Sequence, residues 1–237
     1  MIVFGGRGIL LDVEGTTSSI SFVYDVLFEF ARKHIEDFLA NNRLHPDVQS
    51  AAIALATETG AADATLADPA GTTRLAVAAI DLINRDVKST PLKTLQGMIW
   101  RSGFESGELV SHIFDDVPEA IAQWADSGLD VRIYSSGSIE AQKLFFAHTS
   151  AGNLASHLRG HYDTTTGPKR EAASYRAIAA DMGMEPREIL FISDVGEELD
   201  AARQAGMATA LAIRPGNRPP GGLLEHESLE SFGEIVA

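Results

Sequence analysis

The chain has 237 residues, a hydrophobic fraction of 45% and a formal net charge of −14 at pH 7. This length allows one good hydrophobic core, or one domain with a sizeable insertion. The negative charge argues against nucleic acid and anionic membranes as partners, because both are bound through basic patches. With no cysteine, no long apolar run and no secretory pattern at its start, the sequence predicts a soluble, cytoplasmic protein without disulfides or thiolate metal sites.

The first informative stretch is residues 8–17. The apolar run 9–11 predicts a buried strand, which stops at Asp12 and is broken by Gly15. Asp12 and Glu14 share one phase of the strand alternation, so both carboxylates can point the same way. Such a pair can bind a hard cation, or one member can attack as a nucleophile while the other transfers protons. The alternative from these residues alone is a strand followed by a polar turn.

A long helical stretch follows. The apolar spacing and the positions of Pro and Gly predict four helices, at about 21–40, 46–60, 72–85 and 91–100. We interpret residues 19–105 as a helical cap inserted into an α/β core made of residues 1–18 and 106–237. The alternative is a helical half of an ordinary single domain. We favour the cap because strands resume only after the helices.

Strands and helices alternate in the rest of the chain. Strands are predicted at 131–134, 160–163, 189–192 and 209–213, and helices at 118–127, 139–147, 170–182 and 196–205. This alternation predicts an α/β fold with a doubly wound parallel sheet and a Rossmann-like core. Residues 214–222 are rich in Pro and Gly and predict a loop, and a short helix is expected near the end.

Three of the predicted strands end in polar residues. In a doubly wound sheet, ligands bind beyond the carboxyl ends of the strands. We therefore expect one site built from these strand ends and from a lysine that precedes a helix: Asp12 and Glu14, Ser135 and Ser136, Asp194, and Lys169.

These groups suit phosphoryl transfer. Asp12 and Asp194 can hold Mg²⁺, which prefers a few carboxylates together with water and substrate phosphate. Lys169 would neutralise the nucleophile and the transferring group. Glu14 is placed to protonate the leaving oxygen and then to activate water. The hydroxyls and backbone N–H groups of Ser135, Ser136 and Gly137 can bind the phosphoryl oxygens.

The order of these groups resembles the four motifs of the haloacid dehalogenase superfamily of phosphotransferases. Glu14 departs from the general pattern, because most of the phosphatases carry Asp there. Glutamate matches one branch, the enolase-phosphatases of methionine salvage. The resemblance covers nearly the whole chain, and the segment 95–104 lies outside the four general motifs, so it is the most diagnostic part. The matching segments are 12–23, 95–104, 134–138, 167–171, 193–195, 198–202 and 214–217.

The resemblance implies a substrate and a reaction. The family enolises 2,3-diketo-5-methylthiopentyl-1-phosphate and then removes its phosphate to give the acireductone 1,2-dihydroxy-3-keto-5-methylthiopentene. It implies Mg²⁺ and a monomer. It also implies metal ligands (Asp12, Glu14, Asp194), catalytic groups (Asp12, Glu14, Lys169) and substrate contacts (Ser135, Ser136, Gly137, Lys169). Two points stay open: whether Glu14 ligates through its carboxylate or its carbonyl, and whether Glu14 or a cap residue is the base for enolisation.

The segment 92–100 has two interpretations. It can be a helix that packs Leu95, Ile99 and Trp100 into its own core. It can also close over the phosphate and shape a pocket for the methylthio tail, with Gln96, Trp100 and Arg101 among the substrate contacts.

Four other functions are possible. Segment 95–104 argues against a capped phosphatase for another small phosphate ester. Glu14 argues against a dehalogenase, because dehalogenation needs neither the second acid nor Mg²⁺. A phospho-accepting receiver domain would lack the large helical insert. A non-catalytic relative is the weakest alternative, because all four motif positions are filled.

Overall fold

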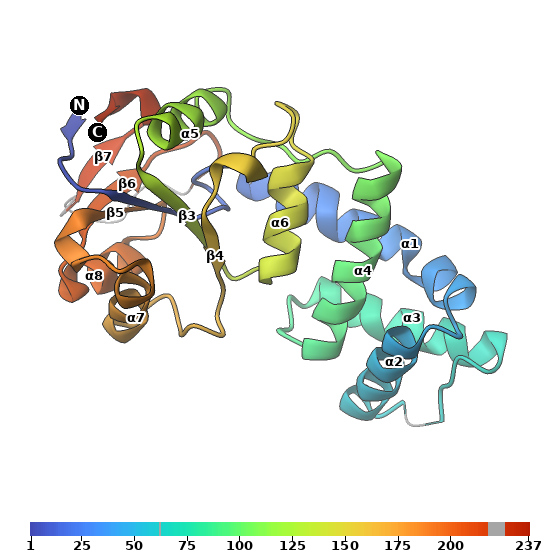
Figure 1. Ribbon diagram of the computed structural model, residues 1–237. Coiled ribbons are helices and arrows are strands. Elements are labelled where there is room, and N and C mark those ends of the chain that lie inside the picture. Colours follow the sequence, from blue (N-terminus) through green and yellow to red (C-terminus); the bar gives the residue numbers. More distant parts are fainter. Residues whose placement is uncertain (62, 218–225) are drawn as a thin grey trace. The chain divides into compact units, whose positions relative to one another are not determined.

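The computed structural model describes residues 1–61, 63–217 and 226–237 and divides into two compact units (Figure 1). The core unit comprises residues 1–23 and 110–237, and the helical unit residues 24–109. Both boundaries fall a few residues later than the sequence predicts. Most of the predicted loop 214–222 lies outside the described residues.

The core unit is built on a six-stranded parallel sheet with the strand order β4-β3-β2-β5-β6-β7. This confirms the predicted doubly wound parallel sheet. The central strand β2 has both neighbours parallel and both faces covered, which explains its unbroken apolar run. The strands are β2 (Gly8–Leu11), β3 (Asp130–Tyr134), β4 (Gly160–Tyr162), β5 (Ile189–Ser193), β6 (Ala208–Ala212) and β7 (Glu227–Leu229).

Helices cover both faces of this sheet. In Figure 1, α5 (Val117–Asp126) lies on one side of the strands, and α7 (Ala172–Met182) and α8 (Gly196–Ala205) lie on the other. Leu10, Tyr134 and Phe191 belong to the same buried cluster as residues of α7 and α8. A further helix, α6 (Ile139–Ala147), follows β3 with the predicted bounds.

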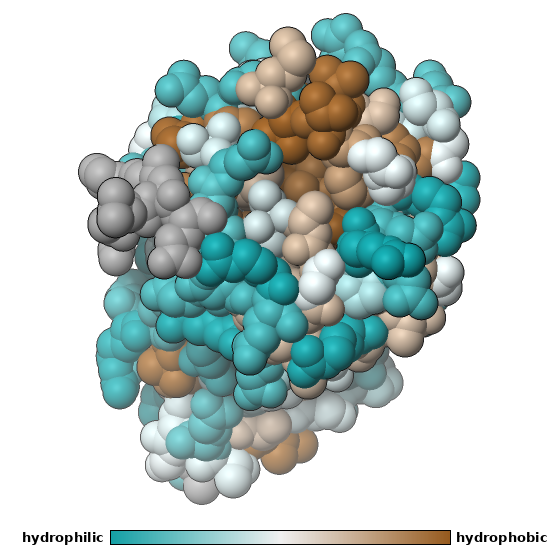
Figure 2. All heavy atoms as spheres, turned by 90° about the vertical axis from the view of Figure 1, so that its left-hand side faces the viewer, coloured by the Kyte–Doolittle hydropathy of each residue, from teal (hydrophilic) through white to brown (hydrophobic). Residues whose placement is uncertain are grey.

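The chain ends differ from the sequence prediction. A two-stranded parallel sheet, β1 (Ile2–Val3) and β8 (Ile235–Val236), joins the first and last residues, and the expected terminal helix is only a 3₁₀ turn, Phe232–Glu234. Strands this short carry no readable alternation. Figure 2 shows the side where both termini lie, and an apolar area is visible on it. Near the chain ends, Met1, Val3 and Val236 are exposed hydrophobic residues.

The helical unit has its own core. Its helices are α1 (Phe28–Asn41), α2 (Pro46–Thr59), α3 (Pro69–Asn84) and α4 (Thr90–Ser106). Each contributes a fully buried leucine to one cluster: Leu39, Leu55, Leu75 and Leu95. Among the described residues, none of the helices is both long and apolar enough to cross a bilayer.

Two helix predictions in this unit are wrong in detail. The first predicted helix begins as a π-helix, Phe22–Leu27, before it becomes α1. The fourth predicted helix, 91–100, ends too early, because α4 passes through Gly103, continues to Ser106 and has Gly107 as its C-cap. A Cβ on Gly103 would lie 2.6 Å from the Phe30 ring. This glycine therefore allows α4 to pack closely on α1 instead of marking a loop.

The two passages of chain between the units are bonded to each other inside the core unit. The backbone N–H of Ser19 donates to His112 Nδ1 at 3.2 Å, and the Ser18 hydroxyl lies 3.2 Å from the same nitrogen. The outgoing and returning segments are thus tied together before the helical unit begins.

Candidate active site

Strand β2 places Asp12 in a buried position at the carboxyl end of the sheet. Its N–H donates to Ile192 O at 3.0 Å, which extends the ladder to β5 by one bond. The carboxylate accepts hydrogen bonds from Lys169 Nζ at 2.6 Å and from Ser193 Oγ at 3.4 Å. Asp12 is only 3% exposed, so its charge is screened little by water.

Lys169 lies between two buried carboxylates. Its Nζ is 2.6 Å from Asp12 Oδ1 and 2.6 Å from Glu198 Oε2. Tyr175 Oη donates to the Lys169 carbonyl at 2.6 Å and fixes the backbone there. Burial alone would lower the pKa of Lys169, but Asp12 and Glu198 raise it above its ordinary value. The side chain is therefore a fixed positive charge.

The site holds more negative than positive charge. Burial and the charge of Asp12 raise the pKa of Glu14, and the same causes raise that of Asp194 to about 7. Burial and Asp12 also raise the pKa of Glu198. Four carboxylates thus feel the charge of one ammonium, that of Lys169, which pairs with only two of them, and a bound cation would relieve their repulsion.

Gly15 brings the loop after β2 against Asp194. Its φ of +75° is a left-handed conformation, and a Cβ there would lie 2.3 Å from Asp194 Oδ2. Only glycine fits this contact without a shift of the carboxylate or the loop. The backbone next to Glu14 therefore lies directly against the Asp194 carboxylate.

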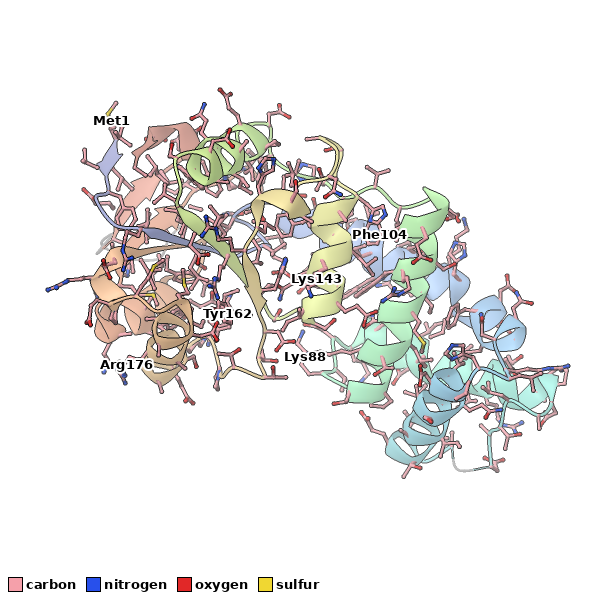
Figure 3. The ribbon with its side chains drawn as sticks, viewed as in Figure 1. Met1, Lys88, Phe104, Lys143, Tyr162 and Arg176 are labelled. Carbon is pink, nitrogen blue, oxygen red and sulfur yellow. The ribbon has the colours of Figure 1, made fainter. Side chains whose placement is uncertain are left out.

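The segment after β3 carries Ser135, whose hydroxyl donates to Glu14 Oε2 at 3.2 Å. The N–H of Gly137 donates to the same hydroxyl, at 3.2 Å, while Ser136 lies exposed. Gln142 of α6 holds this segment, because its Nε2 donates to Gly137 O at 2.8 Å and to Tyr162 O at 2.9 Å. Tyr162 is labelled at the end of β4 in Figure 3.

Direct contacts connect most of the predicted site residues. Lys169 contacts Asp12, and Ser135 contacts Glu14. Asp194 lies next to the same loop, because its carboxylate is in close contact with Gly15. Within the described part of the chain, no three His, Cys, Asp or Glu residues form a group that could hold a metal ion. The Glu14 carboxylate is instead turned to the Ser135 hydroxyl.

Sequence reasoning did not assign Glu198 to the site. It lies four residues after Asp194 in the first turn of α8, and its carboxylate accepts from Ser193 Oγ at 3.1 Å as well as pairing with Lys169. The spacing of two acids one helical turn apart is the signal that could have identified it.

The three predicted contacts in α4 have different surroundings within the helical unit. Gln96 is buried. Trp100 donates from Nε1 to Leu27 O at 2.8 Å and stacks on Phe28. Arg101 is half exposed and lies 3.8 Å from Glu105. The packing interpretation therefore accounts for Trp100, and substrate contact by these residues stays a prediction.

Comparison with known proteins gives consistent matches. Residues 7–206 match the model of the haloacid dehalogenase-like hydrolases. Enolase-phosphatase E1 of Pseudomonas aeruginosa is 46% identical over 230 residues, covering 97% of this chain and 98% of that protein. The enzyme of the same name from Synechococcus elongatus is 49% identical over 214 residues, covering 88% of this chain and 89% of its own.

Solved structures show the same fold. The UTR4 protein of Saccharomyces cerevisiae has a TM-score of 0.80 at 32% identity, covering 97% of this chain and 100% of its own. CbbY of Rhodobacter sphaeroides, in complex with phosphate, has a TM-score of 0.59 at 15% identity, covering 97% of this chain and 96% of its own. Since the sequence matches extend over almost the full length of both partners, the chain belongs to the haloacid dehalogenase-like hydrolases and, within them, to the enolase-phosphatase family.

Proposed function

We propose that this chain is a Mg²⁺-dependent enolase-phosphatase of methionine salvage. Its substrate would be 2,3-diketo-5-methylthiopentyl-1-phosphate, and its products 1,2-dihydroxy-3-keto-5-methylthiopentene and phosphate. The observation that carries the proposal is the pairing of two carboxylates with different partners. Asp12 is held by the Lys169 ammonium, and Glu14 by the neutral Ser135 hydroxyl. The high identity to enolase-phosphatases supports the substrate assignment.

Phosphate transfer uses these two carboxylates in turn. An Asp12 oxygen attacks phosphorus and forms an acyl-phosphate bond, while the ester P–O bond breaks and Glu14 protonates the leaving oxygen. Glu14 then takes a proton from water, which attacks phosphorus, releases inorganic phosphate and restores Asp12. Burial and the charge of Asp12 raise the pKa of Glu14, which favours its protonated form, the form that donates to the leaving oxygen. Lys169 neutralises charge on Asp12 and on the phosphoryl oxygens throughout.

The residues present fit a Mg²⁺ ion. The carboxylates of Asp12 and Asp194 and the carbonyl of Glu14 are the hard oxygen donors that this ion prefers. The excess of buried carboxylates and the missing Cβ at Gly15 support the fit. Bound there, the ion would act as a Lewis acid and stabilise negative charge that develops on substrate oxygens.

Enolisation removes a proton from the carbon that bears the ester oxygen. Glu14 is the candidate base in the core unit, because its carboxylate is bound by a neutral hydroxyl and its pKa is raised. The helical unit is inserted directly after the loop that carries Glu14, and we assign it the role of a cap that limits access of water.

The test is Asp12→Asn, an isosteric change that removes the nucleophile. The purified protein would be mixed with the diketo phosphate and Mg²⁺, following enol absorbance and released phosphate together. The wild type should give an enol signal followed by phosphate. Asp12→Asn should release no phosphate while keeping its melting temperature, and Asp63→Asn, at an exposed position, should behave as wild type. Normal phosphate release by Asp12→Asn would refute the assignment.

A second outcome concerns the substrate alone. If the wild type gives neither signal with the diketo phosphate but still cleaves p-nitrophenyl phosphate, the phosphatase chemistry stands and the salvage substrate does not.

A further inference from the structure

The loop after Glu14 is held by groups from distant parts of the chain. Three consecutive carbonyls accept hydrogen bonds from outside the loop. Asn217 Nδ2 donates to Gly15 O at 2.8 Å, Arg214 Nε donates to Thr16 O at 3.0 Å, and the N–H of Phe114 donates to Thr17 O at 3.1 Å. Buried carbonyls need such partners, so the conformation of this loop depends on them.

Arg214 is itself rigidly placed. Its guanidinium makes a two-bonded ion pair with Asp116, with both distances 3.0 Å, and donates to Glu230 O at 2.8 Å. It lies between the rings of Phe114 and Phe232, at 4.8 and 4.7 Å from their centres. A guanidinium fixed in this way can hold a neighbouring carbonyl with little freedom.

Asn217 holds the loop at Gly15, the residue that lies against Asp194. Its Nδ2 donates to Ala212 O at 3.3 Å as well as to Gly15 O, which links the end of β6 to the loop. Its Oδ1 is buried and has no partner among the described residues. A Cβ built on Gly15 would lie 3.0 Å from this oxygen and 2.3 Å from Asp194 Oδ2. The Asn217 amide and the Asp194 carboxylate thus both lie against Gly15.

We propose that the turn from Arg214 to Asn217 positions the catalytic loop for phosphoryl transfer. The turn fixes the carbonyls of Gly15 and Thr16, and through this backbone it fixes Glu14 relative to Asp194. Asn217 is a positioning residue, because it acts through Gly15. This inference rests on the proposed function. It goes beyond that function by giving a role to a segment outside the four general motifs.

The expected effect is on turnover more than on substrate binding. Without the Asn217 amide, the Gly15 carbonyl loses its donor and the loop can relax by a fraction of an ångström. Displacements on this scale lower the rate of chemistry by about 10- to 100-fold. Glu14 acts in the bond-breaking step, so kcat should fall, while KM should change by less than about threefold.

The experiment compares Asn217→Ala, Asn217→Asp and a matched control, Asn42→Ala. Asn42 also donates its amide to a backbone carbonyl, that of Phe38 at 2.9 Å, but it lies in the helical unit. Measurements are kcat and KM for p-nitrophenyl phosphate and for the diketo phosphate at saturating Mg²⁺, with melting temperatures. We expect the loss of kcat in both Asn217 variants. Asparagine to aspartate keeps the shape but removes the donor. Asn42→Ala should change only the melting temperature.

Four outcomes would overturn the proposal. Asn217→Ala within threefold of wild-type kcat, or Asn217→Asp with wild-type kcat, would show that the donated hydrogen bond does not position the loop. An equal loss of kcat in Asn42→Ala would reduce the effect to general destabilisation. If the wild type cleaves p-nitrophenyl phosphate but does not turn over the diketo phosphate, the substrate assignment is wrong. The comparison of variants can then still be made with p-nitrophenyl phosphate. A wild type that cleaves neither ester would overturn the function and this inference together.

Discussion

The contact between Gly15 and Asp194 gives the sharpest prediction. In Gly15→Ala, the new Cβ would lie 2.3 Å from Asp194 Oδ2, where an ordinary contact is at least 3.4 Å. The carboxylate or the loop must therefore move by about 1 Å. A misplacement of this size costs about 100-fold in rate, so kcat should fall by that factor. The left-handed φ of +75° adds about 1 kcal/mol to the loss of stability.

Gly60 provides a matched control. It ends α2 with a φ of +73°, and nothing lies within 4 Å of a Cβ placed there. Gly60→Ala therefore meets the same backbone strain without a displaced carboxylate. Urea unfolding should give a similar loss of about 1 kcal/mol for that strain in both variants. Only Gly15→Ala should lose turnover, measured as phosphate release over a Mg²⁺ titration.

The reasoning would be refuted by either of two results. Gly15→Ala with kcat within about threefold of wild type would mean that the position of Asp194 does not limit the reaction. A comparable loss of kcat in Gly60→Ala would mean that backbone strain, rather than contact with Asp194, reduces activity.

Two further predictions concern Glu198, beside Lys169, and His161, on β4. Glu198→Gln removes the charge of one of the two carboxylates that hold Lys169, so kcat should fall by about 10-fold, whereas Glu197→Gln, one residue earlier and exposed, should not change it. Burial lowers the pKa of His161 to about 4, with a smaller contribution from Lys143 on α6 (Figure 3). Between pH 6.5 and 4, the unfolded chain therefore takes up a proton that the folded protein does not. Stability should therefore fall as the pH falls through this range, by about 1–2 kcal/mol after allowance for partial exposure. His161→Gln should lose this part of the pH dependence in urea unfolding at pH 7 and 4.5, and unchanged dependence would contradict the explanation.

Much of the core unit could be predicted because its signals are local. The runs around Leu10 and Phe191 are apolar on both faces, as buried parallel strands require, and α6 and α8 have the predicted bounds. Asp12, Ser135 and Lys169 could be grouped because each lies at a strand end or before a helix.

The remainder depends on contacts between distant residues. A glycine such as Gly103 locally predicts a break in a helix, but here the Phe30 ring occupies the space that a Cβ on this residue would need. The local sequence does not distinguish Glu198 from an exposed helix residue, but its carboxylate forms an ion pair with Lys169. The support of Gly15 by Asn217 joins residues separated by most of the chain. No pattern within a short window carries these relations.

The contacts of Ser18 and Ser19 with His112 have a consequence for how this fold can change in evolution. The two chain segments that flank the insertion are hydrogen-bonded to each other within the core unit. The structure of the sheet therefore does not depend on which segment is inserted between them. The buried leucine cluster of the helical unit likewise belongs to that unit. A gene encoding this core could therefore acquire, exchange or shorten the inserted helices without redesign of the sheet, so that new substrate ranges arise by replacement of one module.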